Sequence, residues 1–307
     1  MLVNKDRQNI SFNPLKKNKI KYFFDYKNFF LKPLNFRNKF SAIESDNFII
    51  KLVQTKSELK KAQALRYSVF YKEKKAKPTL PKKLIRLDYD KIDKFADHLI
   101  VIDKNRKNKI VGTYRLIRGD VAELYGGYYS STEFNLINIV NNYQNKHILE
   151  LGRSCVHQNY RNGTIMNLLW KAIAEYVKLY DIKVLIGCAS FSGTDPIKYS
   201  EELTYLRDNF SLPANLSVES YDNNIYPAYK LNNNNNSNPL RTFAKLPPLI
   251  KGYLRVGGKV SDNFFVDYRF NTIDLFVVVC TDDIDTRYKK KILKLTCSKI
   301  SLMKDYI

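Results

Sequence analysis

One stretch of the sequence, residues 149–177 (LELGRSCVHQNYRNGTIMNLLWKAIAEYV), constrains the fold more than any other. It predicts a short strand, a turn at residues 160–163 and an amphipathic helix in immediate succession. The start of a helix presents N–H groups without intrahelical partners and carries partial positive charge. The stretch is therefore typical either of an ordinary strand–turn–helix connection or of a site for a phosphate-bearing cofactor. In the second interpretation, Glu150 and Arg153 on the strand point at the reactive end of that cofactor.

The flanking segments predict a mixed α+β fold. Residues 57–75 have a capping start at Ser57 and apolar residues at helical spacing. The runs HLIVID and KIVGTYRLIR, joined by a polar turn, predict an antiparallel hairpin. Further strands are predicted at 47–54, at 183–190 and in FFVDYRF and DLFVVVC, and further helices in TDPIKYSEELTYLRDNF and LPPLIKGYLRVGG. Strands and helices in this order predict a layered α+β domain.

Changes in composition divide the chain into three parts. Residues 1–45 form a basic segment rich in aromatic residues, which suits a membrane interface or a poorly ordered tail. Residues 46–285 carry the predicted strands and helices and form the folded domain. Residues 286–307 are expected to form a basic C-terminal helix or tail.

The formal net charge of +22 points to a polyanionic partner. Nucleic acid, an anionic membrane surface and an acidic carrier protein would all meet this requirement. A nucleic-acid-binding protein should gather cations and aromatic residues on one face, whereas here an acidic segment at 88–97 interrupts the central region. No RNP, KH or zinc-finger pattern is present, so we expect no specific nucleic acid as partner.

Cysteine and histidine usage argues against disulfide and metal chemistry. The four cysteines are scattered without CxxC spacing, and the three histidines form no HExxH pattern. We therefore predict neither a disulfide framework nor a metal site. The N-terminus lacks a secretory signal pattern, and the most apolar run, 273–280, is too short to cross a bilayer. The expected setting is the reducing cytoplasm.

Five segments, in order, carry a resemblance to a known family. They are LRYSVFYKE, DYDKIDKFADHLIVID, IVGTYRLIR, ELGRSCVHQNYRNG and LPPLIKGYLRVGG. Together they resemble the ornithine N-acyltransferases of ornithine-lipid synthesis, which are similar to acyl-homoserine-lactone synthases and belong to the GNAT superfamily. The resemblance covers roughly residues 48–282 and implies a GNAT-like central mixed, largely antiparallel sheet flanked by helices.

The resemblance also implies an activity. It is the transfer of a (3-hydroxy)acyl chain from an acyl-carrier-protein thioester to the α-amine of ornithine or a similar amino acid, the first step of ornithine-lipid synthesis. Such an enzyme is expected in the cytoplasm, peripherally at the inner face of the membrane, with acyl carrier protein, the amino acid and the anionic membrane surface as partners. The alternatives are an acyl-homoserine-lactone-type synthase, which uses S-adenosylmethionine as amine donor, or another GNAT acyltransferase.

The charged residues of these segments are the expected site, and the resemblance implies that Arg66, Asp90, Asp93, Arg115, Glu150 and Arg153 line it. Glu150 is the favoured base that deprotonates the amine, with Asp90 and Asp93 as alternative catalytic carboxylates. The competing interpretation of Glu150 is an ion pair with Arg153 or Arg115.

Substrate binding is expected to use the same charges. Arginine binds carboxylates through two parallel hydrogen bonds, so Arg66, Arg115 or Arg153 would hold the α-carboxylate of the substrate. The side-chain ammonium of ornithine would then meet Asp90, Asp93 or Asp97. For Asp97 a local capping role is the competing interpretation.

The turn Arg161, Asn162, Gly163 and Thr164 is the expected binding site for the phosphate of the acyl donor. It departs from the usual GNAT loop, Arg/Gln-x-x-Gly-x-Gly/Ala, because Thr164 and Met166 stand at the glycine positions. This departure favours an acyl-carrier-protein thioester over acyl-CoA as cosubstrate. No permanently bound cofactor is expected.

Overall fold

A computed structural model describes residues 40–221 and 238–284 of the chain. Its centre is an eight-stranded sheet with the strand order β1-β2-β3-β4-β6-β7-β10-β9. The strands are β1 (Ile43–Ser45), β2 (Phe48–Leu52), β3 (Asp97–Asp103), β4 (Lys109–Arg118), β6 (Ile148–Val156), β7 (Val184–Ser192), β9 (Lys259–Asp267) and β10 (Thr272–Cys280), and β5 (Phe134–Asn135) pairs separately with β8 (Glu219–Ser220). The predicted mixed, largely antiparallel sheet flanked by helices is confirmed.

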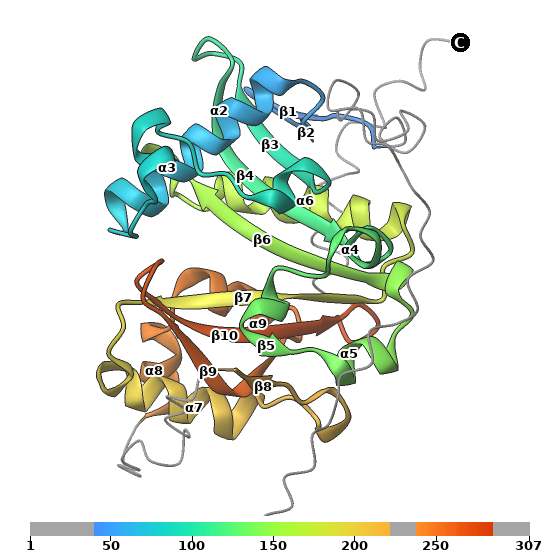
Figure 1. Ribbon diagram of the computed structural model, residues 1–307, viewed down its shortest axis with the longest axis vertical. Coiled ribbons are helices and arrows are strands. Elements are labelled where there is room, and N and C mark those ends of the chain that lie inside the picture. Colours follow the sequence, from blue (N-terminus) through green and yellow to red (C-terminus); the bar gives the residue numbers. More distant parts are fainter. Residues whose placement is uncertain (1–39, 222–237, 285–307) are drawn as a thin grey trace, which may run out of the picture.

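β6 and β7 run parallel and hold the two halves of the sheet together. They pair through Ile148↔Val184, Leu149↔Leu185 and Glu150↔Ile186. Beyond these pairs the strands separate, and Figure 1 shows them diverging toward the left of the view. The divergence begins at Gly187, where a side-chain Cβ would lie 2.3 Å from the carbonyl oxygen of Leu151. Only glycine permits so close an approach of the two backbones.

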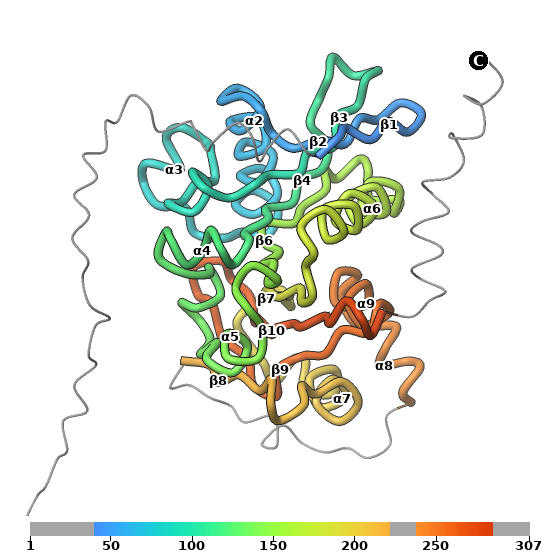
Figure 2. Tube along the Cα trace, turned by 90° about the vertical axis from the view of Figure 1, so that its right-hand side faces the viewer, coloured from blue at the N-terminus to red at the C-terminus, as the bar shows by residue number. Residues whose placement is uncertain are grey.

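Helices cover both faces of the N-terminal half of the sheet. α2 (Lys56–Tyr67) and the π-helical turn Ser68–Glu73 lie on one face, and α6 (Thr164–Leu179) on the other (Figure 2). Side chains of β3 alternate between them, because successive residues of a strand point to opposite faces. Leu99 and Val101 belong to the core under α6, whereas Ile100 and Ile102 belong to the core under α2.

The start of α2 differs from the sequence prediction by two residues. Thr55, and not Ser57, caps the helix: its hydroxyl accepts a hydrogen bond from the Glu58 N–H, and the Glu58 carboxylate accepts one from the Thr55 N–H. This capping box has the sequence Thr-x-x-Glu, which Ser57 cannot provide because no Glu or Gln stands three residues after it.

The C-terminal half of the sheet is covered in the same way. α7 (Ser200–Phe210), α8 (Pro239–Lys245) and α9 (Pro248–Arg255) lie on the face that carries α6. α5 (Ile137–Asn142), β5 and β8 cover the opposite face around Phe134 and Phe276. α3 (Leu80–Ile85) and α4 (Gly119–Tyr125) lie in the connections, and short 3-10 turns occur at Lys91–Lys94, Ser130–Thr132, Asn145–His147, Gln158–Tyr160, Pro196–Tyr199 and Ala214–Leu216.

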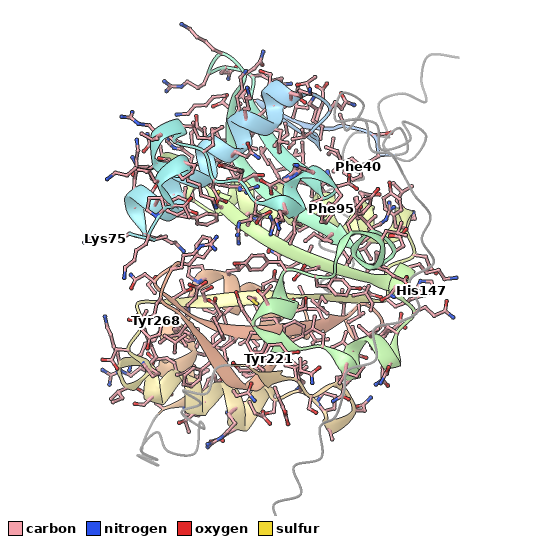
Figure 3. All side chains as sticks on the ribbon, viewed as in Figure 1. Phe40, Lys75, Phe95, His147, Tyr221 and Tyr268 are labelled. Carbon is pink, nitrogen blue, oxygen red and sulfur yellow. The ribbon has the colours of Figure 1, made fainter. Side chains whose placement is uncertain are left out.

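The β9–β10 hairpin extends toward the segment that follows α2. Lys77 donates a backbone hydrogen bond of 2.7 Å to the carbonyl of Arg269, and Phe270 packs on Phe70 and Tyr71. Figure 3 accordingly shows Lys75 and Tyr268 at the same edge of the molecule, where the sheet halves have separated. These contacts bridge the open end of the divergence between β6 and β7.

The two terminal parts of the chain enter this fold only in part. β1 belongs to the sheet although it falls within the segment 1–45, while residues 1–39 and the predicted C-terminal part 286–307 lie outside the described residues. Among the described helices, none combines the length and apolar character needed to cross a membrane.

Candidate active site

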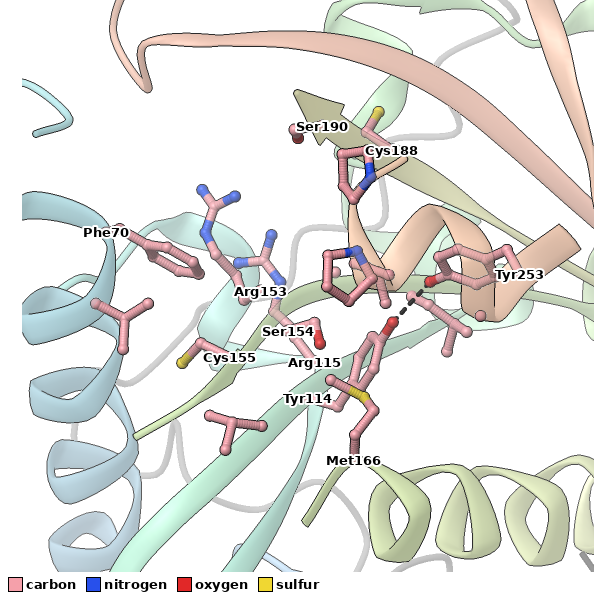
Figure 4. Close-up of a pocket in the computed structure, with 18 of the residues that line it drawn as sticks. Phe70, Tyr114, Arg115, Arg153, Ser154, Cys155, Met166, Cys188, Ser190 and Tyr253 are labelled. Atoms are coloured by element: carbon pink, nitrogen blue, oxygen red, sulfur yellow. Dashed lines mark hydrogen bonds between the residues drawn. The ribbon is translucent and has the colours of Figure 1, made fainter. Parts of the chain in front are cut away.

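A cavity of about 1470 Å³ occupies the space between the diverging strands. Its walls come from β4, β6, β7, the π-helical turn, the start of α6, α9 and the β9–β10 hairpin. Figure 4 shows side chains from these elements converging on it. The cavity is charged where Arg115, Arg153 and Asp274 line it and apolar where Tyr114, Trp170 and Leu249 do. It therefore has room and chemistry for both a polar and an apolar substrate group.

A buried ion network stands behind the charged wall. Arg66 Nη1 and Nη2 lie 3.0 and 2.8 Å from the two carboxylate oxygens of Asp93. Arg66 Nε lies 2.9 Å from Asp88 Oδ2, and Nη2 also donates to the Asp88 carbonyl. Burial alone would lower the pKa of Arg66, but the two aspartates more than reverse this, so the guanidinium stays charged. All its nitrogens have protein partners, so Arg66 fixes the network and leaves no group for a substrate.

Asp88 is the centre of this network, and the sequence analysis missed it. Its side chain is completely buried and contacts Arg66, Lys82 (3.0 Å), Tyr71 Oη (2.9 Å) and Arg153 (3.3 Å). Burial by itself would raise the pKa of Asp88, but the surrounding cations hold it well below its usual value. Asp88 lies in the acidic segment RLDYDKIDKFADH, which the sequence analysis did notice. Composition alone does not show which carboxylate of such a segment is buried.

Arg115 and Arg153 carry the network to the cavity. Arg115 Nη1 contacts both oxygens of Asp90 (2.8 and 2.7 Å) and Asp93 Oδ1 (2.9 Å), and Arg153 Nη2 lies 3.2 Å from Asp90 Oδ2. Arg115 is 1% exposed, yet its Nε and Nη2 have no hydrogen-bond partner among the described residues. Because buried donors are costly to leave unpaired, this edge of Arg115 is suited to an anionic ligand.

The predicted alternative bases are held by these arginines. Burial would raise the pKa of Asp93, but Arg66, His98 and Arg115 lower it far below the ordinary range. The pKa of Asp90 is lowered as well, by Arg115 and Arg153 against the effect of burial. Such carboxylates are weak proton acceptors near neutral pH. The contacts of Asp90 and Asp93 hold the arginine side chains in place. A catalytic role for either carboxylate stays a prediction.

An irregularity in β6 places Arg153. The β4–β6 pairing shifts between Thr113↔Cys155 and Arg115↔Gly152, so β6 has one extra residue, a β-bulge. Arg153 has φ 51° in this bulge, a left-handed conformation that costs a non-glycine residue on the order of 1 kcal/mol. Its ion pairs and its contacts with the rings of Tyr129 (4.4 Å) and Phe270 (4.7 Å) hold it there.

Glu150 lines the cavity at the point where β6 and β7 begin to diverge. Its carboxylate accepts hydrogen bonds from the Tyr129 N–H (2.7 Å), the Ser130 N–H (2.7 Å) and the Ser130 hydroxyl (2.6 Å). Burial raises the pKa of Glu150, and the bonds from Ser130 and Tyr129 only partly offset this rise. Among the described residues, neither Arg115 nor Arg153 forms an ion pair with Glu150. Glu150 thus has a proton affinity suited to a base, and its catalytic role stays a prediction.

Three further carboxyl groups form a cluster at the cavity. One oxygen from each of Glu133, Asp267 and Asp274 lies within 4.8 Å of the others. Glu133 and Asp274 are 3% and 5% exposed. Burial, together with repulsion between the carboxylates, raises the pKa of Glu133 well above its usual value and that of Asp274 to about 6. The sequence analysis missed this cluster, although Asp274 within the apolar strand TIDLFVVVC was a visible signal.

The apolar part of the cavity lies between β4, α6 and α9. Tyr114, Trp170 and Tyr253 form its aromatic wall, and the hydroxyls of Tyr114 and Tyr253 are 2.6 Å apart. Burial raises the pKa of Tyr114 to about 12 and that of Tyr253 well above its usual value, so both hydroxyls stay protonated. α9 comes from LPPLIKGYLRVGG, one of the five segments that carry the resemblance. The predicted core face of α6, which includes Leu169 and Ile173, packs in the main core.

The predicted phosphate turn stands at the start of α6. Gly163 caps the helix with φ 93°, a conformation that glycine adopts freely. Arg161 donates to Glu73 (2.5 Å) and to the Val156 carbonyl (3.0 Å), and the side-chain Oδ1 of Asn162 accepts from the Thr164 N–H (3.1 Å). Arg161 and Gly163 line the cavity. The donor-binding role of these residues stays a prediction.

Asp97 lies apart from the charged wall. Its carboxylate accepts a 2.7 Å hydrogen bond from Tyr176 of α6. This places it on the α6 side of β3 and not beside Asp90 and Asp93. His98, next to it, is buried, and its Nε2 lies 3.1 Å from the Asp93 carbonyl. The structure thus brings the predicted Arg66, Asp90, Asp93, Arg115, Glu150 and Arg153 together and leaves Asp97 outside this group.

Known proteins with similar sequences identify the family. The chain is 37% identical over 246 residues to the L-ornithine N(alpha)-acyltransferase of Rhizobium meliloti, an alignment that covers 79% of this chain and 83% of that protein. The chain belongs to the L-ornithine Nα-acyltransferase family. The family member from Brucella abortus is 33% identical over 243 residues, or 78% of this chain and 86% of its own length.

Membership of the L-ornithine Nα-acyltransferase family agrees with the domain that the sequence matches. Residues 65–171 match the acetyltransferase (GNAT) domain, and they include Arg66, Asp90, Arg115 and Glu150. Among solved structures, a CoA-dependent acyl-homoserine lactone synthase, BjaI, is similar, with a TM-score of 0.46 and 12% identity over 83% of this chain and 89% of its own. The protein is an N-acyltransferase.

Proposed function

We propose that this enzyme transfers an acyl chain from a thioester of acyl carrier protein to the α-amine of ornithine, as the first step of ornithine-lipid synthesis. One observation carries the proposal: the buried, partly unpaired Arg115 faces a cavity that also contains a buried carboxylate, Glu150, and an apolar region. The carboxylate of an amino acid would bind Arg115, its amine would lie near Glu150, and the acyl chain would occupy the apolar region. The relatives named as L-ornithine N(alpha)-acyltransferases support ornithine as the amino acid.

Arg115 is our choice for the group that binds the α-carboxylate. Its unpaired Nε and Nη2 form one edge of the guanidinium, and such an edge donates two parallel hydrogen bonds to a carboxylate. Asp90 and Asp93 occupy Nη1 and so fix the plane of the group. Arg66 is excluded from this role because Asp88 and Asp93 engage all its nitrogens.

Glu150 takes the proton that makes the amine nucleophilic. The α-ammonium gives one proton to the Glu150 carboxylate, directly or through a water, and the neutral nitrogen attacks the thioester carbonyl carbon. A C–N bond forms and the C–S bond breaks. The Tyr114–Tyr253 pair has one hydroxyl proton outside its mutual bond and gives it to the leaving sulfur. The nitrogen passes its second proton back to this pair, directly or through a water, so the pair ends the step as it began. The products are an amide and a thiol, and Glu150 returns its proton to solvent.

Arg161 and the start of α6 receive the phosphate of the donor, and the aromatic region receives its acyl chain. Thr164 and Met166 stand where GNAT enzymes that use acyl-CoA carry glycine. We therefore propose acyl carrier protein as the donor partner, since an acidic protein would also be attracted by a net charge of +22.

The proposed location is the inner face of the membrane, where an acylated amino acid would enter the lipid phase. The net charge supports attraction to an anionic leaflet, at roughly 1 kcal/mol for each Lys or Arg near the surface. α3 adds apolar contact area, because Leu80, Leu84 and Ile85 are 69%, 73% and 54% exposed. Lys83 and Arg86 lie on or next to the same short helix.

Incubation of the purified enzyme with an acyl-carrier-protein thioester or the matching acyl-CoA, and with ornithine, tests the proposal. Mass spectrometry should detect Nα-acylornithine and release of the thiol in equal amounts, with higher kcat/KM for the carrier-protein donor. Formation of no acylated ornithine with either donor would contradict the proposed function. Preference for acyl-CoA would contradict only the choice of donor.

A further inference from the structure

The carboxyl cluster of Glu133, Asp267 and Asp274 has no part in the acyl transfer described above. It is separate from the arginine network, and its members come from the loop after α4 (Glu133), the end of β9 (Asp267) and β10 (Asp274). Asp267 and Asp274 line the same cavity as Arg115 and Glu150. Three acidic groups at one place in a buried cavity repel one another when ionised, so they either bind protons, as the raised pKa values of Glu133 and Asp274 indicate, or gain from a compensating cation.

The protein supplies little compensation. Glu133 accepts a hydrogen bond from the weak donor Cys188 Sγ (3.2 Å), and Asp267 Oδ1 accepts from the N–H groups of Arg269 and Phe270 in the hairpin turn. Asp274 is 95% buried, and side-chain hydrogen bonds with Ser190 and Thr272 lower its pKa in part, but its Oδ1 has no hydrogen-bond partner among the described residues. The positive charge of Arg153 lowers the pKa of Glu133 and of Asp274, but the ion pairs of Arg153 are with Asp88 and Asp90. Asp274 Oδ1 is thus available as a hydrogen-bond acceptor for a ligand that carries a hydrogen-bond donor.

Arg115 provides an independent indication of the same ligand. Its two unpaired guanidinium nitrogens are suited to an anionic ligand group, and the unpaired Oδ1 of Asp274 is suited to a donor, within one cavity. An amino acid whose α-carboxylate binds Arg115 has its side chain left to reach another part of the cavity. A side chain that ends in an ammonium group would donate hydrogen bonds to Asp274, Glu133 and Asp267 and would neutralise their repulsion.

We propose that Glu133, Asp267 and Asp274 bind the side-chain ammonium of the amino-acid substrate and so select diamino acids over amino acids with an uncharged side chain. This inference rests on the proposed function and specifies the part of its site that recognises the substrate. It also explains a charged residue within the apolar strand β10: Asp274 faces the cavity between buried neighbours, where a hydrophobic residue would stabilise the sheet better.

The test compares ornithine with norvaline, which has the same carbon chain but lacks the side-chain amine. The wild-type enzyme should acylate ornithine with a kcat/KM at least about 100-fold higher, because norvaline leaves the cluster without its cation. In Asp274→Asn, and in Glu133→Gln, this ratio should fall below about 5 through loss of ornithine turnover. Asp262→Asn, an exposed carboxylate of the same strand as Asp267, is the matched control and should keep the wild-type ratio.

The possible outcomes distinguish a failure of this inference from a failure of the proposed acyltransferase function. Equal use of ornithine and norvaline by the wild-type enzyme would overturn the inference and leave the acyltransferase activity intact. An equal loss of both activities in folded Asp274→Asn and Glu133→Gln would overturn it too, since a structural role acts on both substrates. Loss of wild-type activity with a chelator, restored by a divalent cation, would assign the cluster to a metal. Failure of the wild-type enzyme to acylate any amino acid would overturn the proposed function itself.

Discussion

Arg66 and Asp93 form a two-pronged ion pair, in which Arg66 Nη1 lies 3.0 Å from Oδ1 and Nη2 lies 2.8 Å from Oδ2 of the aspartate. The arginine side chain is fully buried and that of Asp93 is 3% exposed. The same Asp93 contacts Arg115, so one carboxylate links a structural arginine to one that faces the cavity. The stability of the fold and the shape of the site therefore depend on one group.

Replacing Asp93 with Asn should lower the free energy of unfolding by about 3–5 kcal/mol, because the buried charges of Arg66 and Arg115 would lose the carboxylate they share, and Asp88 and Asp90 would compensate them only in part. Denaturant unfolding at neutral pH measures this change. Asp120→Asn is the control, since Asp120 is 48% exposed in its pair with Arg118 and an exposed pair contributes little. Equal changes in the two variants would contradict the importance of burial.

Arg115→Lys should raise the KM for ornithine by at least about 10-fold, because a lysine ammonium cannot donate two parallel hydrogen bonds to the α-carboxylate. Ornithinamide, which lacks that carboxylate, should lose much less in the same variant. Steady-state kinetics with both amines measures the difference. A KM increase of the same size for ornithinamide would show that Arg115 acts on the amine or on the fold instead.

Ser130→Ala should move the acid limb of the kcat/KM profile to higher pH. The Ser130 hydroxyl donates to Glu150 and lowers its pKa, so removing the hydroxyl raises that pKa, and the ionised base is then reached only at higher pH. Ser131→Ala is the matched control, because the Ser131 hydroxyl donates to the Tyr128 carbonyl. An unchanged acid limb in Ser130→Ala would remove Glu150 as the base.

Gly252→Leu should shorten the acyl chains that the enzyme accepts. Gly252 is on α9 at the apolar part of the cavity, and a Cβ there would meet Trp170 Nε1 at 3.9 Å, an ordinary contact. Gly252→Ala should therefore resemble the wild type, whereas Leu would extend into the cavity and reduce turnover of a long-chain donor about 10-fold. A short-chain donor should be affected less. Equal losses for both chain lengths would place the acyl group elsewhere.

Deleting residues 1–38 should weaken binding to anionic vesicles more than it weakens turnover of a soluble thioester donor, because this segment carries many of the cations and aromatic residues. The cut leaves β1 and its pairing with β2 intact. Leu84→Gln on α3 tests the second proposed contact. Flotation with anionic and neutral vesicles at low and high salt measures binding, and equal binding to both vesicle types would refute an electrostatic association.

Local patterns were enough to predict most of the fold and to single out several charged residues of the ion network. The strands around Leu99, Val111 and Val184 and the helix after Gly163 follow from apolar periodicity, and the arginines and aspartates of the ion network lie in short motifs. The sequence also contains the capping box at Thr55, but Ser57 is an equally favourable N-cap residue by type, and it was predicted instead. These features depend on residues that are neighbours in the sequence.

The rest of the site depends on contacts that sequence order does not reveal. Glu133 and Asp274 meet only because β10 pairs with β7 on the far side of the parallel strands. The left-handed conformation of Arg153 arises from a one-residue mismatch between β4 and β6, and no local residue preference predicts it. Asp88 could not be distinguished from its acidic neighbours until its burial was known.

The ion network joins residues that are distant in the chain: Arg66 and Asp93 are 27 positions apart, Asp93 and Arg115 are 22 apart, and Asp90 and Arg153 are 63 apart. Closing such loops carries an entropic cost before any contact stabilises the chain, so we expect these pairs to form after the helices, whose contacts are local. Helices alone do not form the cavity, whose charged wall depends on these pairs. Recovery of enzymatic activity should therefore lag behind recovery of the far-ultraviolet circular dichroism signal.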